Sequence, residues 1–449
     1  MHTCLRSLFA GALVLGGGLG AIEARAADLG GNCCADLEER IAELEATTVR
    51  KGNRKVSLTI SGWVAEQVTF WDDGVESNTY VHGIGTTLAS HFKMAGQATI
   101  VPGWTAGYVI HVEANSGETL NLDQDDDDGG GPGVGLLQSY WFIKSEMLGK
   151  LSVGQLSQAS DNAAILVDGS GSLVPANWVV FDGPGFILRS GGVRLTDATG
   201  ARALTWGGSM ALCQHSGLGI GADCNGVPTN AVRYDTPTFA GFSLSGSWGE
   251  DDFWDVAARY AGELGGFRLA IAAAYSERYE GTYGGFGGRN NGYVQVGAYL
   301  QHLPTGLFAY GAYGQEFNDN PIATIVSTDG FTSGPVPEGN HWYVKAGLRQ
   351  RWTPLGHTVL YGEYSQYDDM YDADLNDLAN NFFAGTGFTS DSEFRRWGLG
   401  IVQEIDSAAM SLWIKYRNHD GEITGKSASG IRVDLDEVHF VGAGALINF

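Results

Sequence analysis

Hydrophobic and polar residues alternate one by one from Lys55 almost to the end of the chain. The first stretch places Val56, Leu58 and Ile60 on one side, with small polar residues between them. An alternation with a period of two is typical of a β-strand that has one apolar and one polar face. The pattern therefore predicts an all-β chain that is built from strands of about ten residues.

Short turn sequences separate pairs of these alternating stretches at seven places, namely 101–103, 147–150, 237–241, 263–266, 303–306, 353–356 and 406–409. Longer polar segments connect one hairpin to the next, and they include 125–131, 280–291, 318–340, 368–392 and 419–436. Seven hairpins with one further strand at each end give sixteen strands. Short turns at one end of the strands and long loops at the other are typical of outer-membrane barrels. We therefore predict a 16-stranded antiparallel transmembrane β-barrel over residues 53–449.

The polar faces of several strands carry charge. Phe242, Leu244 and Trp248 alternate with serines, whereas Lys345 and Arg349 alternate with apolar residues. A soluble barrel would turn its apolar faces inward, so charged residues opposite an apolar face favour lipid outside and a wet lumen inside. Sixteen strands leave an aqueous lumen rather than a packed core.

The N-terminal region is different. Arg6, the apolar run 8–22 and the small residues around 24–26 predict a signal peptide over residues 1–26. Residues 27–52 form a predicted periplasmic linker with a short helix over 35–48, in which four residues follow coiled-coil spacing: Leu37, Ile41, Leu44 and Thr48. Two heptads are too short to associate alone. The helix would strengthen subunits that other contacts already hold together, and a lone solvated helix is the alternative.

Composition excludes some functions. The net charge of −24 makes nucleic acid an unfavourable partner, because the chain would repel phosphates. Beyond the N-terminus no apolar run is long enough for a membrane-spanning helix. The 67 glycines occur with 11% aromatic residues, which a disordered Gly-rich chain would lack.

Cysteines predict one disulfide. Cys213 and Cys224 bracket a short polar segment of an exported protein, and this arrangement predicts a disulfide-closed loop. Cys33 and Cys34 are adjacent and are either free or paired between subunits. None of the cysteines has the spacing of a metal site, so we expect neither metal nor another cofactor.

An enzyme finds little support in the sequence. The histidines are scattered, and no serine has the setting of an activated nucleophile. The run of aspartates at 125–128 does not fit an EF-hand loop, which favours a flexible acidic loop over a calcium site. A structural tether or adhesin is the alternative to a channel, and only the heptads favour it.

Several segments resemble a known family: DLEERIAELEA at 36–46, NRKVSLTISG at 53–62, PGWTAG at 102–107, NAVRYDTPTFAG at 230–241 and the terminal Phe449. In order and spacing they resemble the alpha-proteobacterial porins of the trimeric general-porin superfamily, over nearly the whole mature chain. The resemblance implies a homotrimer among outer-membrane lipids whose third external loop folds inward. It also implies passage of ions and small hydrophilic solutes, and recognition of Phe449 by the barrel-assembly machinery.

The longest connection, 157–229, is the candidate constriction loop, since so long a structureless loop is unusual without a function. Asp161, Asp168 and Asp182 would face the pore. Six apolar residues would pack the loop to the wall: Ile165, Leu166, Val167, Val179, Val180 and Phe181. Alternation points seven basic residues inward from the wall: Lys93, His111, Lys144, Lys345, Arg349, Lys415 and Arg417. Acids facing bases across the lumen would orient polar solutes. The alternatives are an external lid with solvated acids and ordinary charges at the rim.

The acid-rich loops lead us to expect a modest preference for cations, because the first half of the long loop has no Lys or Arg before Arg189. Lys93, Lys144 and Arg349 oppose that preference.

Overall fold

The computed structural model describes residues 56–117, 119–179, 181–195, 203–207, 226–250, 252–283, 286–318, 338–370, 389–425 and 431–449. The predicted signal peptide, the helix 35–48 and the pair Cys213 and Cys224 lie outside the described residues. In the described part, no helix is long and apolar enough to cross a membrane.

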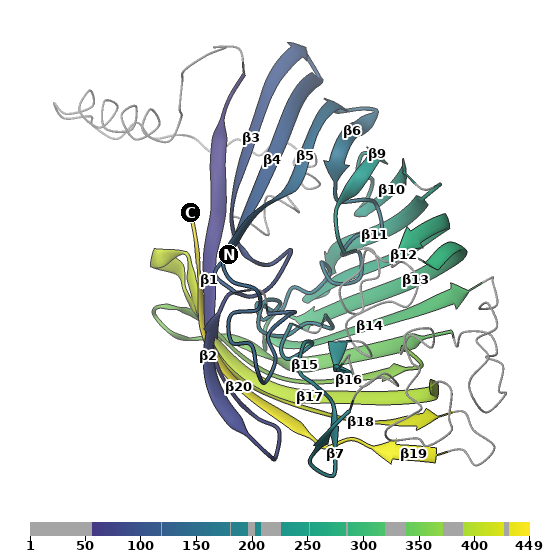
Figure 1. Cartoon of the computed structure of the whole chain (residues 1–449). Helices are drawn as coiled ribbons and strands as arrows, with labels where there is room; N and C mark the ends of the chain where they lie inside the picture. Colours follow the sequence, from purple (N-terminus) through teal and green to yellow (C-terminus); the bar gives the residue numbers. More distant parts are fainter. Residues whose placement is uncertain are drawn as a thin grey trace.

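One large antiparallel sheet makes up the molecule (Figure 1). Its first half consists of β1 (Thr59–Asp72), β2 (Ser77–His82), β3 (Ser90–Val101), β4 (Trp104–Asn115), β5 (Gly133–Ser145), β6 (Gly149–Leu156), β9 (Thr229–Asp235), β10 (Phe242–Gly249) and β11 (Trp254–Leu264). Its second half consists of β12 (Phe267–Tyr283), β13 (Phe286–His302), β14 (Leu307–Asn318), β15 (Asn340–Thr353), β16 (Gly356–Asp368), β17 (Thr389–Ile405), β18 (Met410–Gly425), β19 (Ile431–Asp434) and β20 (Val438–Asn448). A short hairpin, β7 (Arg189–Ser190) and β8 (Val193–Arg194), stands apart, and a 3-10 turn, η2 (Asp406–Ala408), joins β17 to β18.

Two positions in the barrel are each shared by two consecutive strands. β2 pairs with the C-terminal part of β1 and β3 with its N-terminal part, while residues 83–89 between them leave the sheet. β19 and β20 share β18 in the same way. Because β20 also pairs with β1, the sheet closes, and its eighteen strands form a barrel of sixteen positions. The predicted 16-stranded antiparallel barrel is confirmed.

The hairpin turns agree with the prediction, but two loops do not. All seven predicted short turns connect paired strands. The prediction of a loop over 280–291 is wrong, because β12 and β13 continue pairing as far as Tyr283 and Phe286. The predicted loop 419–436 is likewise mostly strand, with β18 reaching Gly425 and β19 returning from Ile431. Polar composition indicated loops here, yet long hairpins also present polar residues beyond the barrel body.

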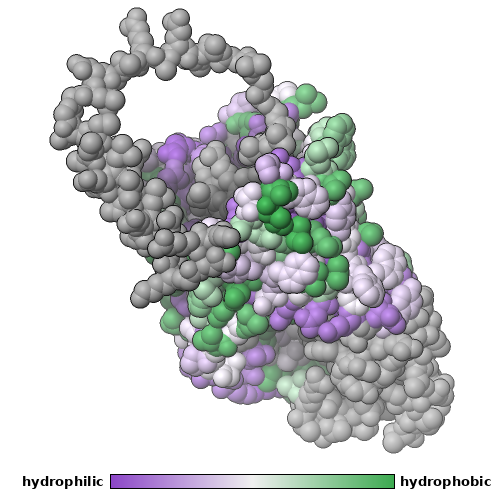
Figure 2. All heavy atoms as spheres, turned by 90° about the horizontal axis from the view of Figure 1, so that it is seen from above, coloured by the Kyte–Doolittle hydropathy of each residue, from purple (hydrophilic) through white to green (hydrophobic). Residues whose placement is uncertain are grey.

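Exposure separates the two faces of the wall. Phe242, Leu244 and Trp248 are 60%, 58% and 65% exposed, whereas Ser245 and Ser247 between them are buried. The large apolar side chains therefore point outward, as predicted, and the small polar ones point inward. Figure 2 shows hydrophobic residues gathered in patches on the face seen there. A register shift of one residue would have reversed this arrangement.

Candidate functional site

Residues 157–179 and 181–195 of the long connection lie against the inward-facing side of the wall, where Figure 1 shows their trace within the curve of strands. We call these residues the long loop. Its first residues are held by two arginines. Arg233 on β9 donates to the carbonyl oxygens of Ser157 and Gln158 at 2.9 and 3.0 Å, and Arg259 on β11 donates to that of Ala159 at 2.6 Å.

Buried polar contacts continue along the next strands. The Ser160 hydroxyl donates to Asp255 Oδ2 on β11 at 2.6 Å, and the Ala164 N–H donates to Gln295 Oε1 on β13 at 3.0 Å. Asp161 accepts hydrogen bonds from its loop neighbours, the Ser157 hydroxyl and the Asn162 amide. It is 3% exposed, so this carboxylate lies among side chains of the loop and does not face an open lumen.

Asp168 is paired with a wall lysine. Lys345 Nζ on β15 lies 2.6 Å from Asp168 Oδ2 and also donates to the Ala176 carbonyl oxygen at 2.7 Å. The side chains of the two residues are 0% and 1% exposed. The sequence prediction set such acids and bases across the lumen from each other; the structure brings this pair into contact.

Asp182 sits in a larger buried network. Its carboxylate contacts Lys415 Nζ at 2.8 Å and also the Arg417 guanidinium, and it accepts a hydrogen bond from Gln67 on β1. Arg417 Nε reaches Glu363 Oε1 on β16 at 2.7 Å. Burial by itself raises the pKa of the Asp182 carboxyl, but the adjacent cations outweigh it and lower that pKa below its ordinary value. Asp182 is therefore a charged anchor of the loop.

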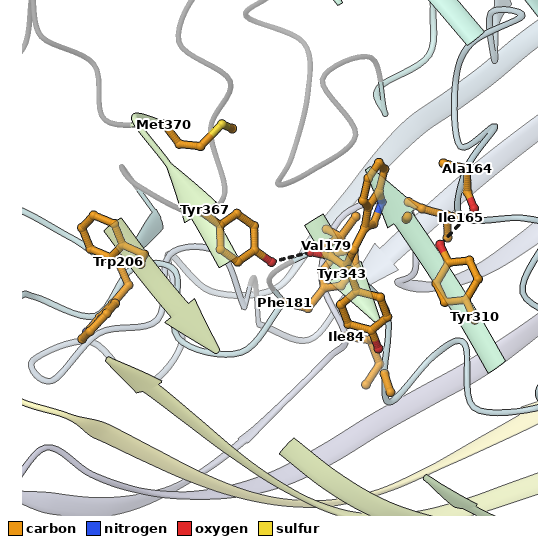
Figure 3. Packing of buried hydrophobic residues seen from close by; sticks show 14 of the residues in the cluster. Ile84, Ala164, Ile165, Val179, Phe181, Trp206, Tyr310, Tyr343, Tyr367 and Met370 are labelled. Atoms are coloured by element: carbon orange, nitrogen blue, oxygen red, sulfur yellow. Dashed lines mark hydrogen bonds between the residues drawn. The ribbon is translucent and has the colours of Figure 1, made fainter. Parts of the chain in front are cut away.

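Apolar packing and tyrosines complete the attachment (Figure 3). Ile165, Val179 and Phe181 are buried, as the prediction of apolar anchors required. The Tyr310 hydroxyl donates to the Ala164 carbonyl oxygen at 2.9 Å, and the Tyr367 hydroxyl donates to that of Trp178 at 2.7 Å. In contrast, Leu166, which was also predicted to pack on the wall, is 40% exposed. Val180, predicted with them, lies outside the described residues.

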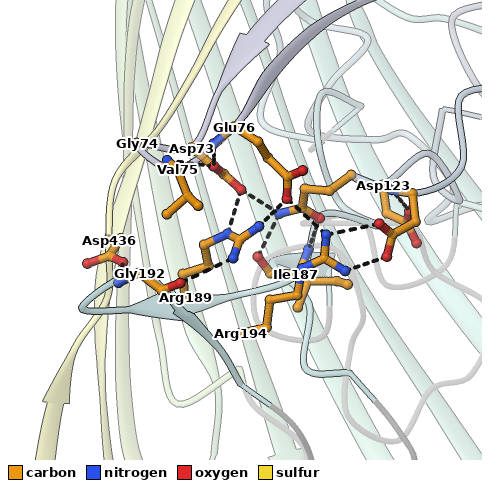
Figure 4. Close-up of polar contacts among 12 residues, drawn as sticks. Asp73, Gly74, Val75, Glu76, Asp123, Ile187, Arg189, Gly192, Arg194 and Asp436 are labelled. Carbon is orange, nitrogen blue, oxygen red and sulfur yellow. Dashed lines mark hydrogen bonds and ion pairs between the residues drawn. The ribbon is translucent and has the colours of Figure 1, made fainter.

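The β7–β8 hairpin fixes the loop's far end (Figure 4). Arg189 Nε lies 2.7 Å from Asp73 Oδ2 in the turn between β1 and β2, and Arg194 pairs with Asp125 in the loop after β4. Asp436 accepts hydrogen bonds from the N–H groups of Gly191 and Gly192 at 3.0 and 2.7 Å. Both glycines have positive φ, 57° and 79°, a backbone conformation that residues with a side chain rarely adopt. Three separate parts of the rim thus hold one hairpin.

The remaining basic residues that the sequence predicted on the wall do not contact the acids of the long loop in any described hydrogen bond or ion pair. Arg349 pairs with Glu404 on β17, at 2.9 Å between Nη2 and Oε2. Lys93 and His111 are in register with each other on β3 and β4, and both project inward. Lys144 also projects inward, is exposed, and lies in register with Lys150. The structure therefore divides the predicted wall residues into a group under the long loop and a group on β3 to β6.

Sequence reasoning missed several inward-facing residues that hold the loop or line the wall: Lys150, Arg233, Arg259, Glu363 and Arg396. The Arg396 guanidinium donates to the Asn177 and Val179 carbonyl oxygens at 2.7 and 3.3 Å. The same alternation could have identified them, since Arg233 lies between Val232 and Tyr234. Arg233, Arg259 and Arg396, however, donate to backbone carbonyls of a loop that is distant in the sequence, and no sequence pattern marks such partners.

Metal ligands are not clustered: among the described residues, no group of three or more His, Cys, Asp or Glu side chains is arranged to hold a metal ion.

The chain end is part of the barrel. Phe449 exchanges backbone hydrogen bonds with Gly62 on β1, with its N–H donating at 3.0 Å and its carbonyl oxygen accepting at 3.1 Å. Its side chain is 60% exposed. The last residue therefore lies at the junction where β1 and β20 close the wall.

Comparison with known proteins agrees with this architecture. A family model described as Gram-negative porin matches residues 40–424. The anion-selective porin from Comamonas acidovorans is similar in structure, with a TM-score of 0.53 at 16% sequence identity, over 88% of this chain and 100% of that one. OmpT, an outer membrane protein of Vibrio cholerae, has a TM-score of 0.50 at 10% identity, over 89% of this chain and 99% of that one. No curated protein matches the chain in sequence.

The two structural likenesses show the shared fold, and the family match extends over most of the chain. The narrower resemblance to the alpha-proteobacterial branch stays a prediction. A barrel of sixteen strand positions with an apolar outer face and a charged inner face is what a channel through the outer membrane requires. The chain belongs to the Gram-negative porin family and is a β-barrel channel of the bacterial outer membrane.

Proposed function

We propose that the channel is a passive one for ions and small hydrophilic solutes, and that the long loop narrows its lumen. The observation that carries this proposal is the series of contacts that ties residues 157–195 to the inner wall from β9 through β18 and on to β1. A loop fixed along so much of the wall occupies lumen volume that solutes would otherwise cross. No catalytic step enters this proposal.

Purified protein in a planar lipid bilayer tests the first part. We expect discrete open steps whose size scales with salt concentration. A protein that folds and inserts but gives no steps would favour the tether or adhesin that the heptads suggest. Deleting residues 158–195 and joining the ends with a short Gly-Ser linker should enlarge each step if the loop narrows the lumen, and steps of unchanged size would refute that role.

We propose further that the chain forms a homotrimer among outer-membrane lipids. Support comes from the family resemblance and from the coiled-coil spacing of Leu37, Ile41 and Leu44. Deleting residues 35–48 should lower the temperature at which trimers separate, while the monomers stay folded. If the deleted protein no longer inserts into membranes at all, the segment has another task. Recognition of Phe449 by the assembly machinery predicts that Phe449→Ala slows insertion in cells without altering the folded channel.

A further inference from the structure

On the described part of the inner wall, a group of basic side chains remains accessible, and its sign is opposite to that of the chain as a whole. The chain carries −24. Three acids around the long loop are almost fully buried against cations: Asp168 with Lys345, Asp182 with Lys415 and Arg417, and Glu404 with Arg349. A buried, paired carboxylate presents little field to an ion that passes at a distance, because its partner cancels it.

A second group of inward-facing charges lies on β3 to β9, and we call it the basic wall cluster: Lys93, Lys144, Lys150 and Arg233. Lys144 and Lys150 are directly opposite each other in the β5–β6 register, and Lys150 is opposite Asp235 in the β6–β9 register. Like charges directly opposite each other destabilise a sheet. The repulsion between the two lysines is offset in part by Asp235 and by the Phe142 ring, over which Lys150 Nζ lies at 5.7 Å from the centroid.

One carboxylate shares this cluster. Asp235 Oδ2 lies 3.7 Å from Lys150 Nζ, and Asp235 Oδ1 lies 2.8 Å from Arg233 Nη2. Lys150 thus experiences attraction from Asp235 and repulsion from Lys93, Lys144 and Arg233. Around Asp235, the three cations Lys144, Lys150 and Arg233 outnumber the one carboxylate, so this part of the cluster is positive.

The cluster is also within reach of water. Lys144 is exposed, and the side chains of Lys150 and Arg233 are 33% and 20% exposed. By contrast, the side chains of Asp168, Asp182 and Glu404 are 1%, 3% and 6% exposed. An ion that passes within a Debye length of about 8 Å of the cluster at physiological salt experiences its field, whereas charges on distant loops are screened.

We propose that the basic wall cluster makes the channel prefer small anions to cations. The net charge of the chain is negative, and the acidic loops by themselves lead to the opposite expectation. This inference rests on the proposed channel function. Its ligand class is any small anion, chloride and carboxylates included, that passes through the lumen beside β3 to β9. The cations act as fixed positive charge that lowers the energy of an anion in the lumen and raises that of a cation.

Reversal potentials in a gradient of KCl test the proposal on the intact channel. We expect anion preference in the unaltered protein. The double variant Lys144→Gln with Lys150→Gln should lower the anion-to-cation permeability ratio by about threefold, because two of the accessible cations are lost near the ion path. Lys144→Arg with Lys150→Arg, which conserves the charge, should leave the ratio unaltered.

A matched control removes the same charge from the outward side. Arg395 and Arg432 project outward near the ends of β17 and β19, and each pairs with a carboxylate there. Arg395→Gln with Arg432→Gln should leave the permeability ratio unchanged. Cation preference in the unaltered channel, or an unchanged permeability ratio in the variant Lys144→Gln with Lys150→Gln, would overturn the proposal. Absence of any open steps would instead refute the channel function on which it rests.

Discussion

Lys345 Nζ and Asp168 Oδ2 lie 2.6 Å apart, and neither side chain has appreciable contact with solvent. The lysine belongs to the barrel wall and the aspartate to the long loop, so this one contact joins two parts of the chain that are 177 positions apart. In so deeply buried an ion pair, loss of one partner destabilises the protein strongly, because the other charge is then left buried without a partner.

Removing one partner should therefore release the loop. Lys345→Met leaves Asp168 as an uncompensated buried charge, and we expect a loss of about 3–5 kcal/mol in the free energy of unfolding. Lys345→Met combined with Asp168→Leu should recover most of it, since no charge is stranded. Denaturant titration of the detergent-solubilised barrel measures both. Arg351→Met, at an exposed pair with Asp406, is the control and should cost only about 0–1 kcal/mol.

The Asp182 anchor predicts how stability depends on pH. Lys415 and Arg417 hold the pKa of its carboxyl below the ordinary value of 3.8 despite burial, which acts in the opposite direction. The stabilisation is therefore fully present above that ordinary value and is lost as the pH falls through the lower folded value. The difference in melting temperature between the unaltered protein and Asp182→Asn should stay constant between about pH 5 and pH 7 and should shrink only in stronger acid. A difference that vanishes by about pH 5 would mean that the carboxyl titrates above its ordinary range.

A charged residue on the outer face of the barrel should destabilise the protein. Ile414 on β18 is 58% exposed on the outer side, whereas its neighbour Lys415 projects inward. Ile414→Arg should destabilise the barrel in lipid vesicles by about 2–4 kcal/mol if the site lies near the bilayer midplane, and by less near either interface. Ile414→Ala controls for lost packing. Equal stability of the Arg and Ala variants would show that this side chain does not face lipid.

The predicted disulfide remains to be measured. Cys213 and Cys224 should react with a thiol reagent only after reduction, and mass spectrometry of a digest should recover them as one linked fragment. Closing so short a loop should stabilise the protein by about 2–3 kcal/mol. Free thiols in oxidised, freshly purified protein would show that the two cysteines are not bonded.

The alternation of apolar and polar residues was sufficient to predict the barrel, its short turns and its outward faces. Phe242, Leu244 and Trp248 point outward because strand geometry places every second side chain on the same face, and the aqueous lumen and the lipid fix which face is which. The same rule pointed Lys345, Lys415 and Arg417 inward. These are local properties of the chain, so the sequence determined them without knowledge of distant contacts.

Only the tertiary structure decided where the long loop's charges find their partners. Asp182 meets Lys415 and Arg417 across more than two hundred positions, and the Asn177 carbonyl oxygen meets Arg396. Such pairs depend on the path of an irregular segment. Its residues follow no periodic pattern, so the sequence does not predict that path. The strand pairing is also interrupted at residues 83–89 and between β19 and β20, where the alternation of residues did not predict a break. Periodicity therefore specified the wall, and the folded path of one long loop specified which charges of that wall remain accessible.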